Sequence, residues 1–274
     1  MVLPIIKWAG GKRQLLPELI KRLPLKFGKY YEPFFGGGAL FFFLQPKQAT
    51  LNDTNSQLIN IYTQIKNSHT KIINILEKTQ NGYNLLEDDT KQTKYYLSKR
   101  NEFNKCITEN ILTVESASLF IFLNKAGYNG LYRVNRKGLF NVPSAHRKTL
   151  KIFDTENILA VSQALQKRTV KCVDFEEACS DIEPGDFVFF DSPYYNAFDT
   201  YQSGGFSECD HIRLAKLFKK LSDKGVYCLE TNSNCEFIKK LYKGFNIDIV
   251  PVKRMINCDS AKRTGNEVII TNFK

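Results

Sequence analysis

A short strand, a glycine turn and a helix follow one another over residues 29–44, and this succession constrains the fold more than any other part of the chain. The strand Lys29–Pro33 leads into two phenylalanines and three consecutive glycines, and the apolar stretch Ala39–Leu44 follows. Glycines adopt backbone angles that other residues avoid, so a strand can turn directly into a helix that accepts a ligand closely. The pattern predicts an α/β fold with a ligand at this turn.

The same alternation of strand and helix returns in the last third of the chain. Residues Phe187–Phe190 form a continuous apolar run, which is typical of a parallel strand buried on both faces. Apolar spacing then predicts a helix over about 208–222 and a strand at Val226–Leu229. Segments 245–252 and 268–273 are predicted to form a closing antiparallel pair.

A largely helical insertion, over about 55–165, is expected to interrupt this sheet. Apolar residues recur at helical spacing from Leu58 to Leu76, and residues 90–123 are predicted to be helical and partly amphipathic. The segment Tyr128–Pro143 differs, since two short apolar and polar stretches flank a turn sequence, Asn135-Arg136-Lys137-Gly138. This segment predicts a β-hairpin.

The glycine turn resembles a nucleotide-binding turn that lacks one element. Gly36 and Gly38 supply two glycines, but Phe41 occupies the place of the third glycine of a dinucleotide fingerprint. Asp53 follows the next expected strand, where an acid can accept hydrogen bonds from ribose hydroxyls. We therefore expect an adenosine-containing ligand without a pyrophosphate. Gly10-Gly11-Lys12 is not a phosphate loop, because the other residues of that motif are missing.

The sequence Asp191-Ser192-Pro193-Tyr194 comes directly after the buried run Phe187–Phe190. Ligands of open α/β sheets bind beyond the carboxyl ends of the strands, which is where this loop is expected. A carboxylate, a backbone carbonyl held by the following proline and an aromatic face suit a planar ring that bears an exocyclic amine. A strand-ending turn with a solvated aspartate is the alternative.

Charge indicates the partner. The chain carries a formal net charge of +11, and no Asp or Glu occurs between Glu115 and Asp154, a stretch that includes the expected hairpin. Basic patches that contain aromatic residues bind nucleic-acid backbones, although a solvated basic face is the simpler alternative. Seven scattered cysteines without a closely spaced pair, and three histidines, make a metal site unexpected.

Five motifs in this order resemble those of the Dam-type (alpha-group) DNA adenine methyltransferases: Lys7–Lys12 (KWAGGK), Glu32–Gly38 (EPFFGGG), Asn52–Asn55 (NDTN), Tyr128–Pro143 (YNGLYRVNRKGLFNVP) and Asp191–Tyr195 (DSPYY). The resemblance implies a Rossmann-like methyltransferase sheet with a mainly helical target-recognition insertion that carries a β-hairpin. Residues 1–54 and 166–274 would form the catalytic, cofactor-binding domain, and residues 55–165 the DNA target-recognition domain.

The resemblance also assigns roles to single residues. It implies S-adenosylmethionine as methyl donor, held by Trp8, Lys12, Phe34, Gly36, Asp53 and Asp191. It implies a catalytic loop formed by Asp191, Ser192, Pro193 and Tyr194, in which Ser192 replaces the second residue of the usual DPPY sequence. It implies DNA contacts by Lys7, Tyr128, Asn129, Leu131, Arg133 and Pro143. No metal is expected.

The expected reaction is methylation of adenine N6 in double-stranded DNA, on an adenine flipped out of the helix. GATC is the first choice of site, although Ser144–Arg147 after the hairpin departs from the sequence typical of GATC enzymes. The alternatives are another short site, cytosine-N4 methylation, protein-glutamine methylation, and a DNA-binding module without activity. A cognate restriction endonuclease is a possible partner. A cytoplasmic location is expected, associated with the nucleoid if the source is prokaryotic, and no membrane association is expected.

Overall fold

The computed structural model describes residues 2–195, 205–253 and 264–274. Within them the chain forms a mixed sheet of seven strands in the order β3-β2-β1-β4-β5-β7-β6. Strands β1 to β5 are parallel to one another, and β7 is antiparallel to both β5 and β6. The predicted Rossmann-like α/β fold is confirmed.

The strands are β1 (Tyr30–Glu32), β2 (Ala49–Asn52), β3 (Thr169–Lys171), β4 (Phe187–Phe190), β5 (Tyr227–Ser233), β6 (Asn246–Lys253) and β7 (Thr264–Thr271).

The strand order reverses between β1 and β4. From β1 the chain adds β2 and β3 on one side and then returns to place β4 on the other side of β1. Tyr30 lies opposite Phe187 in register, and Tyr31 lies opposite Val188. The carboxyl ends of β1 and β4 are therefore neighbours, and such a switch point is where open α/β sheets bind ligands.

The helices of the described residues begin at side-chain caps in most cases, because Asn, Asp, Ser and Thr accept a hydrogen bond from a free N–H in the first turn. Asn55, Thr113 and Ser207 cap α3, α5 and α8 in this way. The helices are α1 (Leu16–Ile20), α2 (Ala39–Leu44), α3 (Ser56–Asn84), α4 (Asp89–Thr108), α5 (Val114–Ala126), α6 (Thr155–Leu165), α7 (Phe175–Ala178), α8 (Glu208–Asp223) and α9 (Glu236–Leu241), with 3-10 turns η1 (Lys12–Gln14) and η2 (Tyr128–Gly130).

The region predicted to be helical, residues 90–123, contains two helices, α4 and α5, separated by a short turn. The chain leaves α4 after Thr108, passes through Asn110 with a left-handed φ of 51°, and starts α5 with a capping box between Thr113 and Ser116. A threonine followed three residues later by a serine is a helix start, and the apolar pattern of α5 masks that signal.

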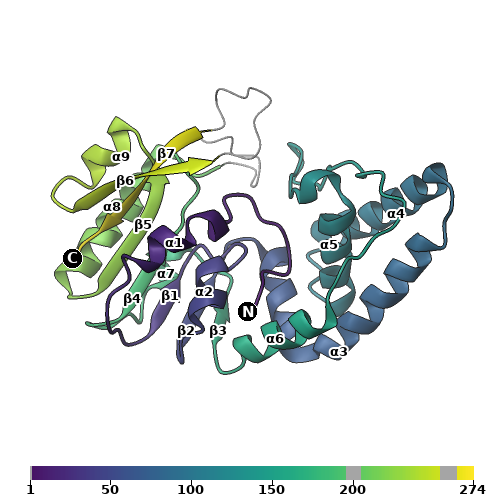
Figure 1. The fold of residues 1–274 in the computed structure, drawn as a ribbon, viewed down its shortest axis with the longest axis horizontal. Helices are drawn as coiled ribbons and strands as arrows, with labels where there is room; N and C mark the ends of the chain where they lie inside the picture. Colours follow the sequence, from purple (N-terminus) through teal and green to yellow (C-terminus); the bar gives the residue numbers. More distant parts are fainter. Residues whose placement is uncertain (1, 196–204, 254–263) are drawn as a thin grey trace.

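The two faces of the sheet are covered by different parts of the chain. Tyr30, Phe187 and Phe189 point to the face that packs against α2 and the insertion, while Val188 and Phe190 point to the face covered by α8 and α9. The first of these cores continues without interruption into the helices α3 to α6, which lie between β2 and β3 in the chain. Figure 1 shows these helices as a layer beside the sheet.

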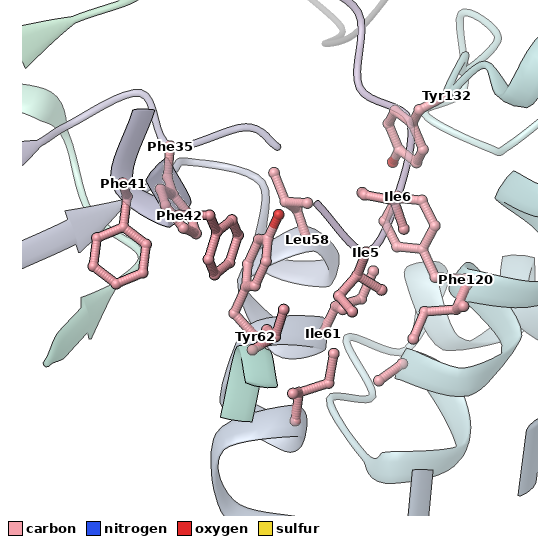
Figure 2. Packing of buried hydrophobic residues seen from close by; sticks show 14 of the residues in the cluster. Ile5, Ile6, Phe35, Phe41, Phe42, Leu58, Ile61, Tyr62, Phe120 and Tyr132 are labelled. Carbon is pink, nitrogen blue, oxygen red and sulfur yellow. The ribbon is translucent and has the colours of Figure 1, made fainter. Parts of the chain in front are cut away.

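The N-terminal segment connects the sheet to the insertion. Figure 2 shows Ile5 and Ile6 lying between Tyr62 of α3 on one side and Phe120 of α5 and Tyr132 on the other. Both isoleucines are buried in the core that these residues share. The segment that carries the KWAGGK motif is thus fixed by its own apolar residues immediately before the motif.

The hairpin has the predicted turn but little strand structure. Asn135 accepts hydrogen bonds from the N–H groups of Lys137 and Leu139 and closes the turn, which ends at Gly138 with a φ of 75°. The two arms pair through isolated bridges, Val134 with Phe140 and, at the base, residue 127 with residue 144. None of the helices in the described ranges has the length and apolarity that crossing a bilayer requires.

Candidate active site

The glycine turn after β1 is built around Trp8. Gly36 and Gly38 both have positive φ angles, 48° and 66°, which favour glycine. A Cβ atom on Gly36 would lie 2.7 Å from Cδ1 of Trp8, so a side chain at this position is excluded by the indole. The turn and the KWAGGK segment therefore lie in direct contact.

Asp53 fixes the same turn from the end of β2. Its carboxylate accepts hydrogen bonds from the N–H of Gly36 at 3.0 Å and from the N–H of Asn55 at 2.9 Å. The Tyr62 hydroxyl donates to the carbonyl of Gly36 at 2.8 Å. Burial raises the pKa of Asp53 to about 6, and the two N–H donors act in the opposite direction.

Asp191 follows β4 and is bound by two side chains from other parts of the chain. Lys12 Nζ lies 2.5 Å from Asp191 Oδ1, and the Thr231 hydroxyl at the end of β5 donates to the same oxygen at 2.8 Å. Lys12 is itself buried and also donates to the carbonyl of Gly10 at 2.6 Å. Burial raises the pKa of Asp191, while the Lys12 ammonium stabilises the carboxylate and opposes that shift.

Tyr194 belongs to the same cluster. Lys12 Nζ lies 4.6 Å from the centre of its ring, within the range of a cation–π contact. Its hydroxyl donates to Glu267 of β7 at 2.8 Å, which fixes the plane of the ring. The ammonium of Lys12 thus contacts both the carboxylate and the aromatic ring of the predicted catalytic loop.

The end of β5 holds the remainder of this loop. Asn232 accepts a hydrogen bond from the N–H of Tyr195 at 3.1 Å, and the Ser233 hydroxyl donates to the carbonyl of Tyr195 at 3.0 Å. Ser192 is buried, with its hydroxyl oxygen 3.5 Å from Nδ2 of Asn232, whereas Pro193 is exposed. A serine therefore fits this position with only a weak polar contact of its own.

The structure brings most of the predicted cofactor residues into two touching groups. Trp8, Gly36 and Asp53 form one group, and Lys12 and Asp191 form the other. The short segment between Trp8 and Lys12 joins the groups. Phe34 lies apart from these contacts: its ring packs against Phe175 of α7 at 5.4 Å and against Phe206 at 5.7 Å.

The predicted DNA-contacting side chains gather at the base and along one arm of the hairpin. Tyr128 is 55% exposed, and its N–H donates to the carbonyl of Pro143 at 2.9 Å, so these two residues lie opposite each other. Asn129 is exposed with a φ of 56°, and Leu131 is half-buried. The guanidinium of exposed Arg133 donates to the side chain and the carbonyl of Asn141 at 2.8 and 3.2 Å.

Lys7 completes this group from the N-terminal segment. Its side chain is exposed and lies against Gly130 of the hairpin, where an added Cβ would approach Lys7 Cδ to 2.6 Å. One residue further on, Trp8 stacks on Tyr132 with ring centres 5.2 Å apart and an angle of 26° between the planes. The predicted DNA and cofactor residues are therefore linked through consecutive positions, 7 and 8.

Sequence reasoning did not identify Thr231 and Glu267 as contacts of the catalytic loop. A signal was available for Thr231, because the polar run Glu230–Ser233 continues an otherwise apolar strand. Polar residues that end a buried strand are candidates for contacts at the carboxyl edge of the sheet. Glu267 lies on an antiparallel strand, and its sequence context gives no comparable signal.

Comparison with known proteins gives full-length matches. Residues 8–256 match the family described as D12 class N6 adenine-specific DNA methyltransferase. The chain is 40% identical over 278 positions to a type II methyltransferase of Lactococcus lactis subsp. cremoris, and the alignment covers 98% of this chain and 95% of the relative. It is 41% identical over 289 positions to a type II methyltransferase of Methanocaldococcus jannaschii, with 99% of each chain covered. A DNA adenine methylase of Haemophilus influenzae is 30% identical over 282 positions, with 98% and 93% covered.

Proposed function

The chain belongs to the D12 class of N6 adenine-specific DNA methyltransferases, and we propose that it methylates a flipped adenine within a short double-stranded site, using S-adenosylmethionine as methyl donor. The family and the enzyme class predicted from the five ordered motifs are confirmed. The family match favours adenine N6 over cytosine N4 as the acceptor. The cofactor, the site, the domain roles and the residue roles are the proposal.

The residues after β1 and β2 fit an adenosine-containing cofactor. The backbone of Gly36 lies close to the indole of Trp8 because glycine has no side chain, and Asp53 supplies a carboxylate at the neighbouring strand end. A ribose has two hydroxyls that donate to such a carboxylate, and an indole offers a flat apolar surface. We assign cofactor contacts to Trp8, Lys12, Phe34, Gly36, Asp53 and Asp191. When bound, S-adenosylmethionine supplies an electrophilic methyl group on a sulfonium.

The catalytic loop is proposed to hold the exocyclic amine of adenine. Both observed contacts of Asp191 reach Oδ1, and we propose that the amine donates one hydrogen to Oδ2 and the other to the carbonyl of Ser192. Pro193 restricts the backbone of Ser192, and Tyr194 supports the ring by stacking. Two acceptors of fixed direction favour a pyramidal nitrogen, which concentrates the lone pair that attacks the methyl group.

The balance of the reaction follows from these contacts. S-adenosylmethionine, held by the residues assigned above, would supply the methyl group to the N6 lone pair and would keep the electron pair of the broken C–S bond on its sulfur. The amine would then lose one proton, and we assign its uptake to Asp191, the carboxylate of the loop. The Lys12 ammonium, 2.5 Å from Oδ1, stabilises the ionised form of Asp191 against the upward pKa shift that burial causes, and an ionised Asp191 can accept this proton.

DNA recognition is proposed to lie on the insertion. Residues 1–54 and 166–274 would form the catalytic part, and residues 55–165 the part that reads the site. The side chains proposed to contact DNA are Lys7 of the catalytic part and, on the insertion, Tyr128, Asn129, Leu131, Arg133 and Pro143. Arg133 suits a guanine, because a guanidinium can donate to O6 and N7 together. GATC is the proposed site, by similarity of the hairpin to GATC readers, and another short site is the alternative. A restriction endonuclease for the same site is a proposed partner, and the cytoplasm the proposed location.

The observation that carries the proposal is the contact of Lys12 with both Asp191 and Tyr194 at the strand switch point, beside the turn formed by Trp8, Gly36 and Asp53. The test is to express the chain in a host without adenine methylation and to sequence its DNA with a method that reports methylated bases. We expect N6-methyladenine at one short site. The Asp191→Ala variant should leave none, and the surface variant Asp223→Ala should match wild type. Unmethylated DNA from a folded wild-type protein would overturn the proposal.

A further inference from the structure

One buried amide joins the N-terminal segment to the hairpin. Asn124 lies on α5 in an otherwise apolar stretch and is completely buried. Its Oδ1 accepts the N–H of Lys7 at 2.9 Å, and its Nδ2 donates to the carbonyl of Lys7 at 2.9 Å and to the carbonyl of Gly130 at 2.8 Å. Burying an amide is costly unless its polar atoms are paired. Here the partners are backbone groups of two segments that lie far from each other in the sequence.

The contacts around Asn124 leave no room for the two segments to slide. Gly130 has a φ of 67°, and a Cβ atom there would lie 2.6 Å from Lys7 Cδ and 3.3 Å from the carbonyl of Asn124. The contact continues along both segments, since Trp8, one residue after Lys7, stacks on Tyr132, two residues after Gly130. The position of the Lys7 side chain is therefore set relative to the hairpin by a hydrogen-bonded amide, a glycine and a pair of rings.

We propose that Asn124 is a positioning residue for the choice of DNA site: it joins the backbone of Lys7 to that of Gly130, so that side chains from both segments meet the bases in one fixed register. This inference rests on the proposed function, in which Lys7 and the hairpin contact DNA. Asn124 itself is buried and acts through the residues it holds. Losing it should weaken discrimination between sites more than it weakens methyl transfer.

The chain contains matched controls for this role. Asn104 of α4 pairs with the N–H and carbonyl of Phe140 at 2.8 and 3.0 Å, and Asn157 of α6 pairs with both groups of Leu3 at 2.9 Å. Each has the same two-bond geometry as the pairing of Asn124 with Lys7. Asn104 holds the hairpin alone, and Asn157 holds the N-terminal segment alone, so neither joins the two.

The experiment compares Asn124→Ala, Asn104→Ala and Asn157→Ala. For each variant, kcat and KM for DNA are measured on the site found for wild type and on sites with one base changed, and thermal unfolding is recorded. We expect all three to lose stability. Only Asn124→Ala should lose discrimination, by about tenfold or more, through KM for the correct site. Discrimination in Asn124→Ala equal to that of both controls would overturn the inference and leave a structural role only.

A second measurement tests the inference even if Asn124→Ala does not fold. Gly130→Ala is expected to displace the Lys7 side chain, so its effect on discrimination should largely disappear in a Lys7→Ala background. Full additivity of the two substitutions would contradict the inference. A wild-type protein without site-specific methylation would instead defeat the proposed function, so the two failures are distinguishable.

Discussion

The strand ends and the hairpin are held in opposite ways. At the strand ends the structure binds the functional side chains themselves, since Lys12, Asp191 and Tyr194 contact one another. In the hairpin the hydrogen bonds from the helices α4 and α5 reach the backbone, for example the carbonyl of Val142 through the Tyr96 hydroxyl at 2.9 Å. The side chain of Tyr128 is left exposed.

This difference matches two different tasks. Group transfer requires reacting atoms that are already oriented, because reorganisation during the reaction costs rate. Reading DNA requires side chains that can adjust to the bases while the backbone keeps its register. We therefore expect substitutions at the strand ends to act on rate, and substitutions in the hairpin to act on the choice of site.

The largest effect is expected for Asp191→Asn. The amide keeps one acceptor oxygen but loses the charge, and it leaves the Lys12 ammonium without its carboxylate, so we expect kcat to fall by about 10²–10³-fold. Transfer of labelled methyl to plasmid measures this, with cofactor binding and circular dichroism as controls of folding. A variant that keeps more than a tenth of the wild-type rate would break the proposed division of tasks.

Arg133→Ala, in the hairpin, should change the choice of DNA site and not the rate of methyl transfer. Removing a guanidinium that reads a base should cost about 1–3 kcal/mol of discrimination at one base pair, with cofactor affinity unchanged. Arg136→Ala, on the exposed turn, is the matched control and should weaken binding to all sequences alike. Competition between correct and one-base-changed oligonucleotides measures both. Unchanged specificity in Arg133→Ala would remove this residue from the reading surface.

Cofactor affinity should depend on pH through Asp53. Because burial raises its pKa to about 6, the carboxyl gains a proton as the pH falls below 6 and loses an acceptor site for a ribose hydroxyl. Affinity should fall by up to about tenfold per pH unit below that value. Titration calorimetry between pH 5 and 8 measures this, and Asp53→Asn should bind more weakly with a flat profile.

The raised pKa of Asp53 affects the stability of the fold in the opposite direction to cofactor binding. The folded-state pKa of Asp53 lies above the usual aspartate value of 3.8, so the folded state takes up the proton first as the pH falls. The cost of burying the ionised Asp53 is fully present above pH 6 and decreases as the pH falls from 6 towards 3.8. Weaker cofactor binding over this range is therefore not due to unfolding driven by Asp53, and thermal unfolding at each pH separates the two.

The smallest effect is expected for Ser192→Pro, which restores the more common family sequence. The serine hydroxyl has only a 3.5 Å contact with Asn232, and its proposed role uses the backbone carbonyl, which proline keeps. We expect kcat to change by less than about fivefold. A larger loss would mean that the hydroxyl itself orients the loop, and Asn232→Ala would then reproduce that loss.

Local sequence predicted the parts of the site that a single strand determines. Asp53 and Asp191 each come directly after a short buried strand, so their place at the carboxyl edge follows from position alone. The ion pair of Lys12 with Asp191 could not be predicted in this way. It depends on how Ile5 and Ile6 pack between the sheet and the insertion, which is a property of the assembled core.

The same distinction applies to the insertion. The turn at Asn135–Gly138 was predictable because its residues favour turns by themselves. Asn124 was not, because a single asparagine in an apolar helix does not reveal which backbone it will bind. The cofactor role of Phe34 stays a prediction, since its observed partners are Phe175 and Phe206.

The core that runs from the sheet into α3 to α6 has a consequence for how the molecule unfolds. Apolar contacts that cross from one layer to the other tie their stabilities together, so we expect both layers to melt in a single transition. Anything that binds the folded state then stabilises the whole molecule. A small molecule bound at the strand ends should therefore slow hydrogen exchange in α4, although it touches nothing there, and should stabilise all of the helices α3 to α6.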